Sequence, residues 1–135
     1  MRTIGTLSEG MGTMGEPQEQ SAASRQAIDD LSRQRLEITM KFFRGLTDMT
    51  RLRIVELLLE ESEQNVSQIV AAVGQPQSRV SSHLACLKWR GYVTTRREGK
   101  YIYYRVADER VASLLLLARG IIADHAHEIL TCTRM

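Results

Sequence analysis

Two cysteines carry the most reactive side chains of this 135-residue sequence, and they lie far apart, at Cys86 and Cys132. In a reducing compartment such thiols stay free or bind metal as thiolates more often than they form a structural disulfide. Thiolates prefer soft ions, and two of them suffice for linear coordination of Hg(II). Cd(II), Pb(II) or Zn(II) would need further ligands, for which His125, His127, His83 or solvent are the candidates.

Each cysteine also has a plainer interpretation. A single cysteine in a helix is commonly a small core residue, and one close to the C-terminus is often simply exposed. The two thiols could instead sense an oxidant by forming a bond with each other. Neither Cys86 nor any cluster of carboxylates has an evident base partner, so the sequence predicts no enzyme activity and no organic cofactor.

The elements that would position these thiols follow from the spacing of apolar residues. Residues 1–22 hold several glycines and polar residues but almost no large apolar side chains, which predicts a disordered tail. From Ser24 onward, apolar residues recur at helical spacing and predict a first amphipathic helix, which ends near Gly45. Asp48 or Thr50 can then cap a second helix, over MTRLRIVELLLEE.

The middle of the chain predicts a helix-turn-helix. A short helix capped by Asn65 or Ser67 is closed by the Gly-Gln-Pro sequence of residues 74–76, because glycine tolerates a left-handed conformation and proline cannot continue a helix. The next helix, QSRVSSHLACLKWRG, has one apolar face, made by Val80, Leu84 and Leu87. Polar residues project elsewhere near its start, and these are Gln77, Ser78, Arg79, Ser81 and Ser82.

A β-hairpin and a long terminal helix complete the predicted fold. Two segments rich in β-branched and aromatic residues are joined by Arg97-Glu98-Gly99-Lys100, which predicts a wing. The terminal helix is capped by Asp108 and has a wide apolar face, so together with the first helix it should form a dimer interface. Trp89 is expected to cover the hinge between recognition helix and wing. Residues 23–135 thus form one mostly α domain with a β-hairpin (α+β), a winged helix-turn-helix.

The charge distribution points to duplex DNA. The formal net charge is only +2, but residues 77–105 contain seven basic residues and one acid. Gln77 and Arg79 have the geometry to contact adenine or guanine, whereas the serines at 78, 81 and 82 are short enough for phosphates. Arg96, Arg97 and Lys100 of the hairpin would contact the DNA backbone. The alternative is that a basic hairpin is only a solvated edge protected by its charge.

Membrane and secretory signals are missing from the sequence. No run of about 18 apolar residues occurs, and the first residues lack a basic stretch followed by an apolar core. A cytoplasmic protein without a membrane partner is therefore expected.

The order of these elements strongly resembles the ArsR/SmtB family of metal-responsive repressors over about residues 25–132. The most specific pieces are TRLRI, the QSRVSSHL start of the recognition helix, the GYV after it, and a hairpin that ends in YYRVAD. The resemblance implies a winged-helix homodimer that binds operator DNA and represses an operon until a metal or another inducer lowers its affinity.

The resemblance also implies where a metal could bind. The cysteine pair of the second-helix site type is missing here, and in the terminal-helix zinc type Arg110 replaces the histidine that would follow Asp108. The branch with Cys-Leu-x-x-x-Cys in the recognition helix and a C-terminal cysteine fits better, because Cys86 and Cys132 match while Arg90 replaces the third cysteine. The prediction is a repressor released by a thiophilic ion, Hg, Cd or Pb rather than Zn. A repressor that senses thiol oxidation and a constitutive DNA-binding regulator remain alternatives.

Overall fold

The computed structural model describes the backbone of residues 15–132 and the side chains of residues 21–132. The chain divides into two compact units, residues 1–41 and residues 42–135. Helix α2 (Gly15–Arg44) begins within the segment expected to be a tail, and residues 1–14 lie outside the described part, so the boundary at residue 22 stays a prediction. All side chains of residues 22–41 are exposed, including the predicted apolar stripe.

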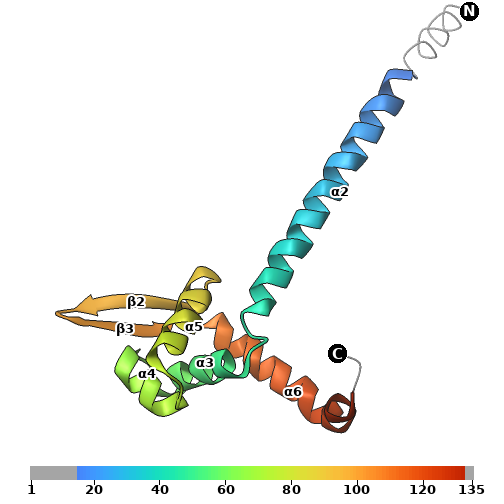
Figure 1. Cartoon of the computed structure of the whole chain (residues 1–135). Helices are drawn as coiled ribbons and strands as arrows, with labels where there is room; N and C mark the ends of the chain where they lie inside the picture. The colour runs from blue at the N-terminus through green and yellow to red at the C-terminus, as the bar shows by residue number, and fades with distance from the viewer. Residues whose placement is uncertain (1–14, 133–135) are drawn as a thin grey trace, which may run out of the picture. The chain divides into compact units, whose positions relative to one another are not determined.

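The second unit has the predicted order of a winged helix-turn-helix, and it confirms a mostly α fold with a β-hairpin (Figure 1). Helices α4 and α5 form the helix-turn-helix, and strands β2 and β3 form the wing that projects beside them. The elements after α2 are α3 (Met49–Glu61), β1 (Gln64–Asn65), α4 (Val66–Val73), α5 (Gln77–Trp89), β2 (Val93–Glu98), β3 (Tyr101–Val106) and α6 (Arg110–Thr131).

Local capping chemistry sets most of the helix ends as the sequence predicts. The Asp48 carboxylate accepts a hydrogen bond from the backbone N–H of Arg51 at 3.0 Å, which starts α3. At the start of α4, Asn65 and Gln68 cap each other's backbone N–H groups in a capping box. Gly74 ends α4 with φ of 67°, the left-handed conformation that glycine adopts without steric cost.

The sheet has three strands in the order β1-β3-β2, one more than the predicted hairpin. A two-residue connection, Gly99-Lys100, joins β2 to β3, and Gly99 has the positive φ of 61° that such a tight turn requires. The additional strand β1 pairs Gln64 with Tyr104 and Asn65 with Tyr103. Two residues are too few for an alternating pattern, so no sequence signal predicts this strand.

The core lies where the helix-turn-helix meets α3 and the base of the wing. Three apolar residues of α5 are completely buried there, as predicted, and each contributes roughly 1.5–3 kcal/mol by leaving water. The buried set is Ile54, Val55, Leu58, Ile69, Val73, Val80, Leu84, Leu87, Tyr92, Val93 and Val111.

One expectation near the end of a helix needs correction. Trp89 is 90% exposed and covers no hinge, because it occupies the last position of α5, beyond the buried face. At the start of α6, the Asp108 carboxylate accepts a hydrogen bond from the backbone N–H of Arg110 at 2.8 Å, as the predicted cap requires. Glu109, which lies between them, has helical φ and ψ and makes no capping hydrogen bond with its side chain.

A close contact holds the turn after α2 against the end of α5. The ring of Phe42 stacks on buried Tyr92 at 4.5 Å between centroids, and the Tyr92 hydroxyl donates a hydrogen bond to the Phe42 carbonyl. A Cβ atom on buried Gly45 would lie 2.8 Å from both the Tyr92 ring and the Arg90 side chain. Only glycine fits at this position without displacing its neighbours.

We therefore expect Gly45→Ala to lower the free energy of unfolding by about 1–3 kcal/mol, because the added methyl group would displace the completely buried Tyr92 ring. Gly120→Ala is the matched control, since nothing lies within 4 Å of a Cβ there and the residue is inside a helix. That control should raise the free energy of unfolding by up to about 1 kcal/mol. Urea unfolding at one protein concentration measures both, and an unchanged value for Gly45→Ala would contradict the packing argument.

Candidate nucleic-acid interface and thiol positions

The N-terminal turns of α5 present a polar surface. All five residues predicted to contact DNA from this helix are exposed, whereas its apolar face is buried; the five are Gln77, Ser78, Arg79, Ser81 and Ser82. Pro76 is the N-cap and provides no side-chain hydrogen bond, so the first backbone N–H groups of the helix are available to an external acceptor. Within the described part of the chain, the Arg79 side chain makes one hydrogen bond, to Gln75 at 3.3 Å.

Two contacts fix α5 to its neighbours, one at its middle and one near its C-terminal end. His83 lies between residues of α3 and its cap, with Nδ1 at 3.3 Å from the Arg51 guanidinium and Nε2 at 3.8 Å from the Asp48 carboxylate. The backbone hydrogen bond from Arg51 is the main reason that the pKa of Asp48 is lowered. Near the other end, the Lys88 ammonium donates to the Thr95 hydroxyl of β2. His83 is thus a packing residue of the helix.

The three basic residues predicted to contact DNA from the wing differ in their surroundings. Arg97 and Lys100 are exposed, and within the described part of the chain neither forms an ion pair with a carboxylate. Arg96, by contrast, donates hydrogen bonds at 2.7 Å to Glu63 and to Glu98. The hydrogen bond from Arg96 is the main cause of the lowered pKa of Glu63.

The two cysteines are both free thiols in different settings. Cys86 is half-buried on α5, and its sulfur accepts a hydrogen bond from the Arg90 Nε at 3.2 Å. Cys132 is exposed at the C-cap of α6. His125 and His127 are exposed on α6, and the backbone leaves helical geometry at His125. Among residues 21–132, no three or more histidine, cysteine, aspartate or glutamate side chains form a cluster that could hold a metal ion.

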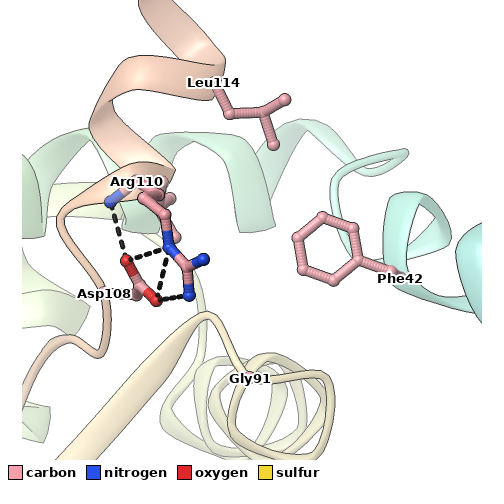
Figure 2. Close-up of a pocket in the computed structure, with 6 residues that line it drawn as sticks. Phe42, Gly91, Asp108, Arg110 and Leu114 are labelled. Carbon is pink, nitrogen blue, oxygen red and sulfur yellow. Dashed lines mark hydrogen bonds and ion pairs between the residues drawn. The ribbon is translucent and has the colours of Figure 1, made fainter.

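The start of α6 holds a carboxylate that is already paired. A cavity of about 320 Å³ lies beside it. Figure 2 shows two residues that line this cavity, Asp108 and Arg110, with the carboxylate bound by the guanidinium. The hydrogen bonds from Arg110 lower the pKa of Asp108 to about 2. The same pairing explains why the zinc-type terminal-helix site is not reconstituted at Asp108. The rest of the cavity is mostly apolar and is lined by Phe42, Gly91, Val111 and Leu114.

Beyond this cavity, α6 has large apolar side chains on its surface. Its first turns are anchored by buried Val111 and by an ion pair between Arg119 and Glu56 of α3. The exposed apolar residues of the helix are Leu116, Leu117, Ile121, Ile122, Ile129 and Leu130, with exposures of 47–85%. None of the described helices is long and apolar enough to cross a membrane.

Known proteins are similar to the part of this chain that contains the helix-turn-helix. A family model described as "Bacterial regulatory protein, arsR family" matches residues 48–95. The chain is 44% identical over 99 residues to the "Probable mercury resistance operon repressor" of Streptomyces lividans, and the match covers 73% of this chain and 78% of that protein.

Solved structures show the same arrangement. The crystal structure of Rv0081 from Mycobacterium tuberculosis has a TM-score of 0.65 and 31% identity, over 71% of this chain and 96% of that chain. The homodimeric winged helix-turn-helix DNA-binding domain of Mb0332 from Mycobacterium bovis, a possible ArsR-family regulator, has a TM-score of 0.64 and 35% identity. That match covers 73% of this chain and 90% of that chain.

Proposed function

Because this chain belongs to the arsR family of bacterial regulatory proteins, we propose that it represses transcription as a homodimer bound to operator DNA and is released by a thiophilic metal ion, foremost Hg(II), at Cys86 and Cys132. One observation carries the proposal. The 13-residue helix α5 has the exposed polar surface that would contact DNA and also bears the half-buried thiol of Cys86. A ligand bound to that sulfur therefore acts on the DNA-reading element itself.

The exposed surface of α5 fits the major groove of DNA. Gln77 and Arg79 lie in the first turn, where a recognition helix contacts base edges, and the serines beside them can donate to phosphates. The wing adds Arg97 and Lys100, whose positive charges would lie against the sugar-phosphate backbone. Arg96 stays a predicted contact whose carboxylate partners are considered below.

The exposed apolar residues of α2 and α6 support a homodimer. Ile28 and Leu31 of α2 are 61–62% exposed, and Ile121 of α6 is 64% exposed, in a single chain. Apolar surface of this extent is rarely left in water, and a two-fold dimer would bury the same surface on both protomers. The homodimeric state of the Mb0332 domain is consistent with this assignment.

Two thiols favour Hg(II) among the possible inducers. Hg(II) can be held by two thiolates, so it needs no third ligand beside Cys86 and Cys132. The name of the Streptomyces lividans relative, which concerns mercury resistance, supports the same choice. Bridging would tie the recognition helix to the terminal helix and would change the spacing of two half-sites that are about one DNA turn, roughly 34 Å, apart. Operator affinity would then fall without unfolding.

For the DNA contacts, we expect Gln77→Ala and Arg79→Ala each to cost about 1–3 kcal/mol in operator binding and to relax its sequence preference. Arg97→Ala and Lys100→Ala should weaken binding to every duplex alike. Each should also lower the slope of log affinity against log salt concentration by about one, because each removes one charge that faces a phosphate. Fluorescence anisotropy over a salt series, with operator and scrambled duplexes, measures both effects. If the α5 variants weakened binding equally for both duplexes, α5 would not read bases.

For the dimer, we expect the double variant Ile121→Lys/Ile122→Lys to be monomeric in light scattering and to bind operator weakly. Both side chains are exposed in the single chain, so the fold should persist, whereas Leu115 packs against the core and is a poorer choice. Ser113→Lys is the control, because it adds a charge to α6 at an exposed position that is already polar. A double variant that remained dimeric would place the interface elsewhere.

For induction, we expect Cys132→Ser to keep the operator affinity of the metal-free protein and to lose release by Hg(II). In the unchanged protein, binding of Hg(II) should lower the affinity for operator DNA by about 5-fold to 150-fold. Cys86→Ser should behave in the same way unless α5 also needs the packing of that side chain. The measurement is operator release during Hg(II) titration of reduced protein, together with thiolate-to-metal absorption. Thr131→Ser is the control, because it changes the exposed residue beside Cys132 without removing a thiol or an imidazole.

Other outcomes of that titration identify the alternatives. Release by an oxidant without metal, and no retention of Hg(II) under reducing conditions, would indicate a thiol-oxidation sensor. Full repression with no response to any metal or oxidant would indicate a constitutive regulator. Release by Hg(II) in the double cysteine variant would show that the metal binds at another site, and Asp124, His125 and His127 would be tested next.

A further inference from the structure

Arg96 is the most heavily engaged side chain of the wing. Its guanidinium donates to Glu63 through Nε and to Glu98 through another nitrogen, both at 2.7 Å, and lies 4.7 Å from the centre of the Tyr103 ring. Glu98 and Tyr103 belong to the wing itself, but Glu63 lies 33 residues earlier in the chain, between α3 and β1. The Glu63 contact therefore connects the wing to the body of the domain.

The register of the strands places the two neighbouring arginines on opposite faces of the wing. Arg96 pairs with Tyr103, and Arg97 pairs with Ile102, so their side chains alternate. Thr95, which shares the face of Arg97, accepts a hydrogen bond from Lys88 of the recognition helix. Arg97 is thus on the face directed toward α5, and Arg96 is on the face directed toward Glu63.

The charges around Arg96 argue against a phosphate contact. One guanidinium is shared by two carboxylates, so the group of Arg96, Glu63 and Glu98 has a net negative charge when all three are ionised. Arg105 adds one positive charge on the Glu63 side of this group. A phosphate brought to Arg96 would meet both carboxylates, and like charges at such distances repel. Arg97 and Lys100 present no such carboxylates within the described residues.

The wing needs an anchor of this kind. A two-stranded ribbon is only marginally stable in water, and the third strand supports it over just two residue pairs at the middle of β3. Glu63 directly precedes that strand, on the side nearer the base of the wing, and its side chain reaches across β3 to Arg96 of β2. Ser62, with a positive φ of 68° that is uncommon for a residue with a side chain, makes the turn that leads from α3 into Glu63.

We propose that Arg96 is a positioning residue, which through its ion pair with Glu63 holds the wing in the orientation that brings Arg97 and Lys100 to DNA. The proposal rests on the proposed DNA binding by the wing. Removing the negative charge of Glu63 should therefore weaken DNA binding, although removal of an acid near a DNA surface ordinarily strengthens it.

The experiment compares Glu63→Gln, Arg96→Gln and the double variant with Arg97→Gln as the matched control. Glu63→Gln and Arg96→Gln should each lower operator affinity about fivefold or more at fixed salt, and the double variant should bind no more weakly than either single variant. Neither should change the slope of log affinity against log salt, because the loosened wing is ordered on DNA at a cost in affinity and Arg97 and Lys100 then meet the same phosphates, whereas Arg97→Gln should reduce the slope. Exposed ion pairs add little to folding stability, so all variants should remain folded.

Hydrogen exchange of the free protein tests the same anchor without DNA. The amides of β2 and β3 should exchange faster in Glu63→Gln and Arg96→Gln than in Arg97→Gln, because only the first two release the wing. Unchanged exchange would overturn the proposal, as would a reduced salt slope for Arg96→Gln or a higher operator affinity for Glu63→Gln. If Arg97→Gln alone leaves DNA binding unaltered while exchange responds as expected, the anchor stands and the proposed DNA contact of the wing fails.

Discussion

The burial of one face of α5 is the constraint on which the surface and the thiol chemistry of this domain depend. Val80, Leu84 and Leu87 recur at helical spacing and are completely buried in the core. A rotation of α5 about its axis would expose these side chains to water, at roughly 1.5–3 kcal/mol for each one. The helix therefore has one rotational setting, in which its polar first turns face outward and Cys86 lies at the edge of the buried face.

Around Cys86 the same packing creates a short path to the end of α2. The sulfur accepts a hydrogen bond from Arg90, and the Arg90 side chain packs on Gly45 in the turn that follows α2. Tyr92 closes this group through its contacts with Phe42. Burial raises the pKa of Tyr92 to about 12, so the phenol remains a neutral hydrogen-bond donor at physiological pH. A ligand at the sulfur would act on a region where little can move independently.

The distribution of charge along this chain, more than its net charge, determines how strongly it would attract DNA. A net charge of +2 would predict weak attraction to DNA, and the excess of basic residues in the second half of the helix-turn-helix and wing reverses that expectation. The fold then adds an acid from a distant part of the chain, since Glu63 binds Arg96. Among the residues described, Arg97 and Lys100 near the tip of the wing form no ion pair with a carboxylate.

Interactions between residues close in the chain determined what the sequence could predict. Capping by Asp48 and Asn65, the left-handed Gly74, the Gly99 turn and the apolar face of α5 all act within a few residues, so their patterns are visible in the sequence. Contacts between distant residues were decided by the tertiary structure alone. The sequence does not place Glu63 beside Arg96, pair β1 with β3, or leave Trp89 in solvent, because each outcome depends on how separate elements pack.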